Sequence, residues 1–329
     1  MAQKHPHLHR FAHEAMATIF EAIIEEEDAT YAGQAAQAFF QEVDRLEGLL
    51  SRFNACSELC QVNQLAPGET TRVGFDLFEC LRIAREIYDK TAGAFDVSIG
   101  ALMNCLRAEH GRPLEVTDEE RDAALARVGM KRLGLNPETF EVTVLAAEGG
   151  GKVSLDLGGI GKGYALDRGA ELLRDWGIES AILQSGTSTA LAIGSPRFSG
   201  EEDAVKGWLL GAGAEWDQAA GFGTLRLKNE ALSGSGKQVK GDHILDPRTG
   251  YPVRGRLAAW SIAPTAAVAD ALSTAFMVLS TEEVMDVCRA NPEYSALVAV
   301  RRPGILGAFQ EETIASPGFR LRSAPAKAT

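Results

Sequence analysis

The sequence predicts an α+β fold built mainly on antiparallel sheet. Helix-like and strand-like segments do not alternate strictly along the chain, strand-like segments dominate from about Gly177 to Ala263, and no internal repeat is evident. A doubly wound parallel sheet needs a helix after nearly every strand, and this order is missing. The pattern therefore favours sheets packed with helices rather than alternating βα units.

The first third of the chain reads as a strand followed by helices. Alternation over residues 10–26 suggests a strand, and residues 31–50 form an amphipathic pattern. A Ser/Asn-rich loop is expected next, then a helix over residues 75–90 that Gly93 stops. Thr117-Asp-Glu-Glu120 is a capping box, which predicts the start of a third helix. The apolar positions of the first helix recur at helical spacing: Ala32, Ala35, Phe39, Val43, Leu46 and Leu50.

The rest of the chain begins with strands over residues 131–154, joined by polar turns and broken at Gly149-Gly150-Gly151. A helix from Tyr164 to Trp176 is expected to end at Gly177, as helices often do at glycine. Further strands follow, interrupted by a charged loop (Glu201, Glu202 and Asp203) and by the turn that contains His243. Helices near 267–279 and 281–290, the second capped by Ser280 with Glu283, and a strand at 295–301 complete the pattern.

Length and charge limit the possible organisation and function. With 329 residues and 45% hydrophobic content, the chain is long enough for one large domain or two modest ones. We expect a single catalytic domain over 10–316, whether as one unit or as two intertwined subdomains, with an N-terminal arm at 1–9 and a flexible tail at 317–329. The net charge of −12 argues against a nucleic-acid partner, because phosphate backbones are bound by basic patches.

Cysteine content and hydropathy favour a cytoplasmic protein. The five cysteines are scattered and odd in number, which is typical of reduced thiols rather than a disulfide framework or a zinc site. No run approaches the roughly 18 apolar residues of a membrane span. The N-terminus also lacks the continuous apolar stretch of a secretory signal. Four histidines at its start (His5, His7, His9 and His13) are expected to belong to an exposed polar arm.

Three short stretches, far apart in the chain, carry residues that nucleotide and metal chemistry needs. Asp156-Leu-Gly-Gly-Ile-Gly-Lys162-Gly offers bare backbone and an amine where a strand runs into a helix, which suits a phosphate. His243-Ile-Leu-Asp246-Pro-Arg-Thr-Gly250 places a histidine in a turn. Asp270 and Thr274 share one helical face, and their oxygens suit magnesium. Taken singly, each stretch also has a purely structural interpretation.

The glycine-rich stretch does not match the two best-known nucleotide motifs. A P-loop needs Ser or Thr after its lysine to ligate magnesium, and Gly163 stands there. The glycine spacing also differs from the G-x-G-x-x-G of dinucleotide-binding folds. Phosphate binding is therefore expected from backbone and lysine rather than from either motif.

In their residues and in their order along the chain, the three stretches resemble those of the FAD:protein FMN transferases, the ApbE-type flavin transferases. The resemblance covers most of the chain, from about Met16 to about Thr274, and implies a T-fold-like architecture with FAD as substrate and Mg²⁺ as cofactor. It implies that Asp270, Thr274 and the main-chain carbonyl of Gly159 bind the metal. It also implies that His243 acts as an acid–base group beside a reacting hydroxyl, which a pKa near neutrality would permit.

The resemblance extends to cofactor contacts elsewhere in the chain. Ala92-Gly-Ala-Phe-Asp-Val97 looks like a further family stretch, and Met16-Ala-Thr18 like the family's Met-Gly-Thr. Phe53 falls where relatives carry Tyr against the flavin ring, and its aromatic face is sufficient for stacking. The residues expected to bind the cofactor are Met16, Phe53, Ala94, Phe95, Asp96, Asp156, Lys162, Ile244 and Ser273.

The resemblance implies that FMN is transferred from FAD to a Ser or Thr hydroxyl of an acceptor protein, with AMP released. Two alternatives stay open: an FAD pyrophosphatase that gives FMN and AMP, and a non-enzymatic FAD-binding protein. The pyrophosphatase is favoured only by two departures from the family pattern, at Gly234 and at Ser185-Gly186-Thr187, which lie near the acceptor side in relatives. The binding protein would be favoured if metal ligands were absent, yet Asp270 and Thr274 are present.

Overall fold

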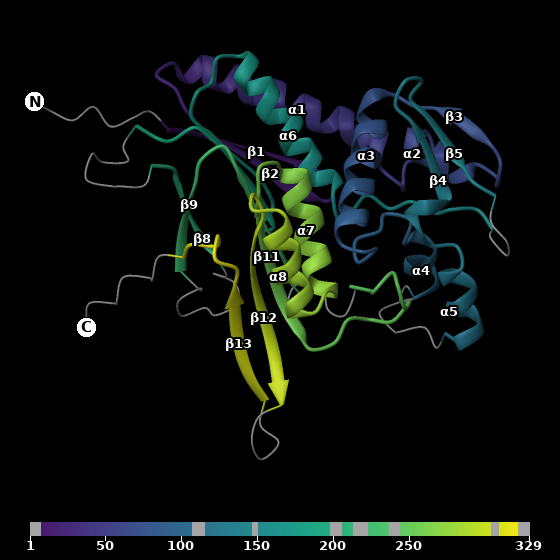
Figure 1. Ribbon diagram of the computed structural model, residues 1–329. Coiled ribbons are helices and arrows are strands. Elements are labelled where there is room, and N and C mark those ends of the chain that lie inside the picture. The colour runs from purple at the N-terminus through teal and green to yellow at the C-terminus, as the bar shows by residue number, and fades with distance from the viewer. Residues whose placement is uncertain are drawn as a thin grey trace, which may run out of the picture.

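The computed structural model describes residues 8–106, 116–146, 151–197, 206–212, 223–236, 244–303 and 309–321. In these ranges an eight-stranded sheet carries helices on one face and a short hairpin on the other (Figure 1). Neighbouring strands of the large sheet all pair antiparallel, which confirms the α+β class. In sheet order the strands are β1 (Leu8–Ala15), β2 (Thr18–Glu25), β6 (Ala181–Ser185), β7 (Thr189–Ile193), β10 (Ala231–Gly236), β11 (Arg256–Ala263), β12 (Ser295–Pro303) and β13 (Phe309–Ala315).

The helices and the smaller sheets surround this large sheet. A three-stranded sheet lies beyond the helical layer, and the β8–β9 hairpin covers the opposite face. The small-sheet strands are β3 (Thr70–Arg72), β4 (Leu133–Asn136), β5 (Glu141–Val144), β8 (Trp208–Ala212) and β9 (Gly223–Leu227). The helices are α1 (Ala29–Leu50), α2 (Glu58–Gln64), α3 (Phe75–Lys90), α4 (Gly100–Cys105), α5 (Asp118–Leu125), α6 (Gly161–Asp175), α7 (Ala266–Val278) and α8 (Thr281–Ala290), with a short 3₁₀ turn at Met130–Arg132.

Local capping signals fixed several helix starts correctly. Both capping boxes form: the Thr117 hydroxyl accepts from the Glu120 amide and the Ser280 hydroxyl from the Glu283 amide, and each glutamate reaches back. Helix α3 spans the predicted residues, and Gly93 follows it with a φ of +80°. These signals work because each depends on residues within one helical turn.

The single strand expected over residues 10–26 is wrong, because this segment is a β-hairpin. Strands β1 and β2 pair up to Ala15 and Thr18, and the connecting Met16 and Ala17 both have positive φ. Two-residue hairpin turns of this kind are usually made by Asn-Gly or Gly-Gly, since other residues are strained there. Met-Ala carries no such signal, so the turn could not be read from the sequence.

Other element predictions also need correction. The Ser/Asn-rich loop after α1 contains helix α2, whose N-cap is Ser57, and the unexpected helix α4 follows the 94–96 segment. Helix α6 starts at Gly161, so Lys162 lies in its first turn rather than before it. In the expected flexible tail, Phe319 is buried in the core between the large sheet and the β8–β9 hairpin.

Several predicted features lie outside the described residues: the first part of the histidine-containing arm, Gly149-Gly150, the charged loop at 201–203, and His243. Among the helices that the structure describes, none is both long and apolar enough to cross a lipid bilayer.

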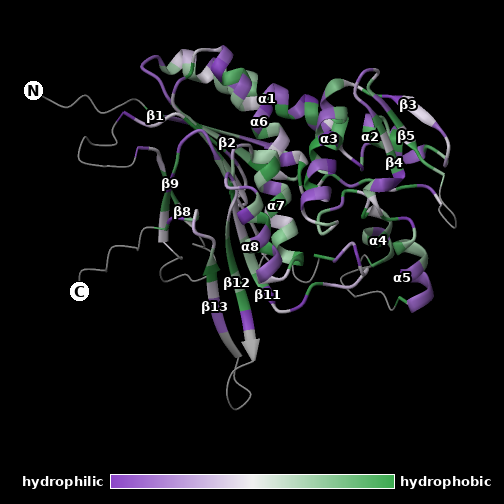
Figure 2. Ribbon diagram, viewed as in Figure 1, coloured by the Kyte–Doolittle hydropathy of each residue, from purple (hydrophilic) through white to green (hydrophobic). Residues whose placement is uncertain are grey.

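Helix α7 is the centre of the packing. It lies between the sheet and the helices α6 and α3 (Figure 1), and it contacts β10, β11, α6 and α3. Its side chains are therefore buried around nearly its whole circumference. Most of its residues are accordingly hydrophobic (Figure 2). In a helix that is buried on all sides, a carboxylate is not solvated by water, and such a group is rarely buried unless it is paired. Asp270, only 5% exposed in this helix, therefore marks a polar site inside the protein.

Gly163 allows α6 to approach the start of α7 closely, and its replacement by alanine is expected to destabilise the fold. A β-carbon at Gly163 would fall far inside van der Waals contact with the backbone carbonyl of Ala266. Overpacking of this kind costs about 1–3 kcal/mol, or more where backbone must move. Urea unfolding should show the loss. Gly48→Ala is the matched control: it is a helical glycine with nothing within 4 Å of the added methyl, so its alanine should stabilise by up to about 1 kcal/mol.

Candidate active site

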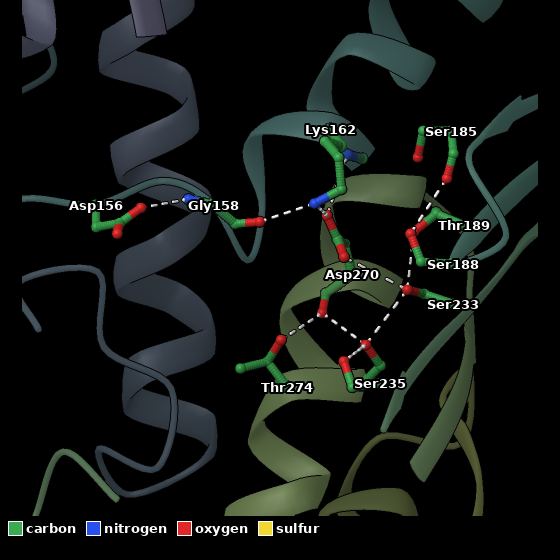
Figure 3. A network of polar contacts seen from close by, with 12 residues as sticks. Asp156, Gly158, Lys162, Ser185, Ser188, Thr189, Ser233, Ser235, Asp270 and Thr274 are labelled. Atoms are coloured by element: carbon green, nitrogen blue, oxygen red, sulfur yellow. Dashed lines mark hydrogen bonds and ion pairs between the residues drawn. The ribbon is translucent and has the colours of Figure 1, made fainter. Parts of the chain in front are cut away.

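The glycine-rich stretch and the start of α7 meet at one point, as Figure 3 shows. Lys162, in the first turn of α6, donates to the carbonyl of Gly158 at 2.8 Å, and its amine lies 3.8 Å from Oδ2 of Asp270. The same Oδ2 accepts a hydrogen bond from the backbone amide of Gly163 at 3.3 Å. One carboxylate oxygen thus faces both an ammonium group and a helix N-terminus, which gives the site local positive potential in an acidic protein.

Thr274 and Gly159 complete this cluster from either side. The Thr274 hydroxyl donates to the Asp270 carbonyl one turn back at 3.3 Å, which leaves its oxygen lone pairs available. A β-carbon at Gly159 would lie 3.3 Å from that hydroxyl oxygen and 3.3 Å from the ring of Phe95. Only a glycine fits this approach without displacing either neighbour. The arrangement therefore brings main chain at Gly159 next to the Thr274 hydroxyl.

The oxygen donors gathered here fit a hard cation. A carboxylate, a hydroxyl and main-chain carbonyls are ligands that Mg²⁺ accepts, with phosphate oxygens and waters filling the remaining positions. The described residues hold no cluster of three or more His, Cys, Asp or Glu that could bind a metal. A cation at this site would accordingly depend on Asp270 as its charged ligand, with Thr274 and Gly159 as neutral ones.

Asp156 is anchored by its neighbours. Its Oδ1 accepts the Gly158 amide at 2.8 Å, and its Oδ2 lies 3.2 Å from Nε of Arg52. The Arg52 guanidinium in turn stacks 4.8 Å from the ring centroid of Phe53, whose side chain is among the most exposed apolar groups, at 73%. This contact connects the glycine-rich stretch to the aromatic residue expected to meet a flavin. Sequence reasoning missed Arg52, because its partner is 104 positions away.

The residues of the 94–96 segment have different surroundings: Phe95 lies beside the site, whereas Asp96 is hydrogen-bonded away from it. Phe95 packs beside Gly159, and Ala94 is buried next to it in the chain. The Asp96 carboxyl group is hydrogen-bonded to other residues. Its Oδ1 accepts hydrogen bonds from the amide and the hydroxyl of Ser98, and its Oδ2 accepts one from the amide of Met130. Burial raises the pKa of Asp96, while these hydrogen bonds oppose the shift. Its carboxylate therefore anchors this loop in the described structure.

The other predicted residues lie on separate elements. Ser273 is adjacent to Thr274 on α7, and its hydroxyl donates to the Asp270 carbonyl at 2.9 Å. Met16 forms part of the β1–β2 turn, and Ile244 is buried in the segment before β11, where its carbonyl accepts the Val253 amide. His243 precedes Ile244 but lies outside the described residues, so its role stays a prediction.

The start of α7 is held by Asp167 of α6. Its two carboxylate oxygens accept the amides of Ala266 and Ala267 at 2.7 and 2.8 Å. These bonds satisfy two free amides of the helix terminus and so position the turn that precedes Asp270. Burial, only partly opposed by the two amides, raises the pKa of Asp167 to about 7.

Asp167 should make stability depend on pH. In the unfolded chain this carboxyl titrates near its ordinary value of 3.8, whereas in the folded protein it holds its proton up to about pH 7. Folding therefore favours the protonated group, and its stabilising contribution falls as pH rises from about 4 to 7. Asp167→Asn removes this titration. Urea unfolding at several pH values should show the difference between wild type and Asp167→Asn changing across that window; a constant difference would refute the assignment.

Gly234 is one of the two positions that depart from the family pattern, and a side chain at this position would point away from the site. Ser233 and Ser235 point toward α7, and side chains alternate along a strand, so Gly234 points to the opposite face of the sheet. A β-carbon at Gly234 would collide with the indole of Trp260. The glycine at this position thus accommodates a tryptophan on the far side of the sheet.

The comparisons with known proteins agree with one another. The sequence model of the ApbE family matches residues 16–298. The FAD:protein FMN transferase of Vibrio cholerae is 28% identical over 76% of each chain, and that of Klebsiella pneumoniae is 28% identical over 88% of this chain and 87% of its own. Among solved structures, the flavinyl transferase ApbE of Pseudomonas stutzeri superposes with a TM-score of 0.80 at 22% identity, covering 97% of both chains. The ApbE protein of Thermotoga maritima gives 0.75 at 26% identity, covering 92% of this chain and 96% of its own.

Proposed function

The chain belongs to the ApbE family, and we propose that it is a magnesium-dependent enzyme that transfers FMN from FAD to an acceptor protein. The acceptor group is a Ser or Thr hydroxyl, and AMP is released. The observation that carries this proposal is the convergence of Thr274, Gly159 and Lys162 around the buried carboxylate of Asp270. The FAD:protein FMN transferase names of the curated relatives support it.

The reaction breaks one bond of a pyrophosphate and forms one phosphoester. The acceptor hydroxyl oxygen attacks the phosphorus on the FMN side, and the bond from that phosphorus to the bridging oxygen breaks. AMP leaves with the bridging oxygen, and the hydroxyl proton passes to a base. Charge accumulates on the phosphate oxygens, so catalysis depends mainly on positioning and on neutralising that charge.

The described residues are suited to these tasks. Lys162 places a positive charge next to Asp270, where it can offset phosphate charge, and the amides at the start of α6 face the same region. Asp270, Thr274 and the Gly159 carbonyl would hold Mg²⁺, which when bound supplies Lewis-acid polarisation of the phosphates. His243 would accept the hydroxyl proton. Arg52 keeps Asp156 and Phe53 in place at the edge of the site.

One incubation separates this function from its alternatives. The protein is mixed with FAD, Mg²⁺ and a lysate of its source organism, and products are followed by flavin fluorescence in denaturing gels and by chromatography of nucleotides. A covalently fluorescent protein band together with AMP supports the transferase. Free FMN and AMP without a labelled band identify a pyrophosphatase. FAD that is bound but not cleaved identifies a flavin-binding protein and overturns the proposal.

A further inference from the structure

The inner face of β10 presents two hydroxyls to α7. Ser233 and Ser235 are two residues apart on the strand and therefore share one face. The Ser233 hydroxyl lies 3.5 Å from Oδ1 of Asp270, and the Ser235 hydroxyl lies 2.8 Å from that of Ser273 (Figure 3). The carboxylate oxygen that does not face Lys162 is thus contacted by one hydroxyl group from the sheet, that of Ser233.

These hydroxyls form a connected network that reaches a second strand. Thr189 of β7 lies 2.9 Å from the Ser233 hydroxyl, and Ser273 lies 3.3 Å from it. Ser233 and Ser273 have no exposed surface, and Thr189 is 2% exposed. Buried hydroxyls of this kind must satisfy one another, because bulk water does not reach them.

Counting protons gives the network a direction. Each hydroxyl has one proton to donate. The Ser273 proton goes to the Asp270 carbonyl, so Ser235 must donate to Ser273. Ser233 could donate to the hydroxyl oxygen of Thr189, to that of Ser273 or to the Asp270 carboxylate, and a charged acceptor binds the proton more strongly. Ser233 therefore donates to Asp270, and Thr189 donates to Ser233.

We infer that Ser233, oriented by Thr189, is a positioning residue that fixes the Asp270 carboxylate for cation binding. Its donation to Oδ1 and the Gly163 amide's donation to Oδ2 hold the carboxylate plane from both sides. This inference rests on the cation site of the proposed function. Hydrogen-bond partners of metal ligands orient the ligand, and their removal typically lowers metal affinity about 10–100-fold.

The test measures Mn²⁺ binding to FAD-free protein by electron paramagnetic resonance, with Mg²⁺ competition to confirm the site. Ser233→Ala should weaken Mn²⁺ binding about 10–100-fold. Thr189→Val keeps the side-chain shape but removes the hydroxyl that orients Ser233, so it should weaken binding in the same direction. Thr189→Ser keeps the hydroxyl and should restore wild-type affinity.

Ser261 provides a matched control. It lies opposite Ser233 in the β10–β11 pairing and is equally buried. Its hydroxyl also donates to α7, but to the carbonyl of Ala269 at 2.5 Å rather than to the Asp270 carboxylate. Ser261→Ala should leave Mn²⁺ affinity within about twofold of wild type, well short of the loss expected when a ligand's partner is removed. Equal effects at Ser233 and Ser261, or none at Ser233 and Thr189, would overturn the inference while the cation site stands. A wild-type protein that binds neither ion would overturn both.

Discussion

Replacing Asp270 with alanine is expected to abolish AMP release from FAD. The change removes the only carboxylate in the described oxygen cluster, the group that faces Lys162 and the Gly163 amide. Without it, the proposed cation would lose its charged ligand and the pyrophosphate would lose charge neutralisation. Turnover should be measured as AMP formed at millimolar Mg²⁺, with circular dichroism to show that the variant is folded. Wild-type turnover in Asp270→Ala would disprove the proposed metal site.

Two further variants sharpen this result. Asp270→Asn keeps the shape and one oxygen but removes the charge, so high Mg²⁺ should partly restore its turnover. Asp76→Asn controls for loss of a buried carboxylate outside the site: Asp76 pairs with Arg45 and accepts from Tyr164 between α1, α3 and α6. Its replacement should lower the free energy of unfolding but not AMP release from the folded protein.

Replacing His243 with alanine is expected to reduce covalent flavin transfer about 10²–10⁴-fold, the usual effect of losing a general base. FAD binding should persist, because Asp156 and Lys162, which we propose bind the cofactor, are held in place by Gly158 and Arg52. Hydrolysis of FAD to FMN and AMP should suffer less, because water approaches by several routes and needs less positioning. The measurement compares labelled acceptor with free FMN in one reaction.

A histidine elsewhere in the fold serves as control. His13 on β1 pairs with Asp44 of α1 at 2.7 Å and stacks on Phe40. It is far from His243 in the sequence, and neither of these partners belongs to the proposed site. His13→Ala should leave both reactions unchanged. If His243→Ala transferred flavin at the wild-type rate, the base would have to be another group.

The sequence by itself determined the features that depend on near neighbours. The capping boxes at Thr117 and Ser280 and the helix over residues 75–90 follow from residues within a turn or two of each other. The grouping of strand-like segments indicated the α+β class. The residues of three motifs indicated the ApbE family, whose sequence model matches residues 16–298. A glycine-lysine turn and an Asp-x-x-x-Thr helix face could each be recognised locally, because their spacing alone defines them.

The tertiary structure decided which of those features meet and what surrounds them. It joined Lys162 to Asp270 and Arg52 to Asp156, contacts across 108 and 104 positions that no local pattern encodes. It turned Met16 and Ala17 into a strained hairpin turn, because pairing of β1 with β2 outweighs the local preference of those residues. It also placed Ser233 beneath the Asp270 carboxylate. A serine in a strand becomes a partner of a carboxylate only when sheet and helix pack together, since the packing removes both from water.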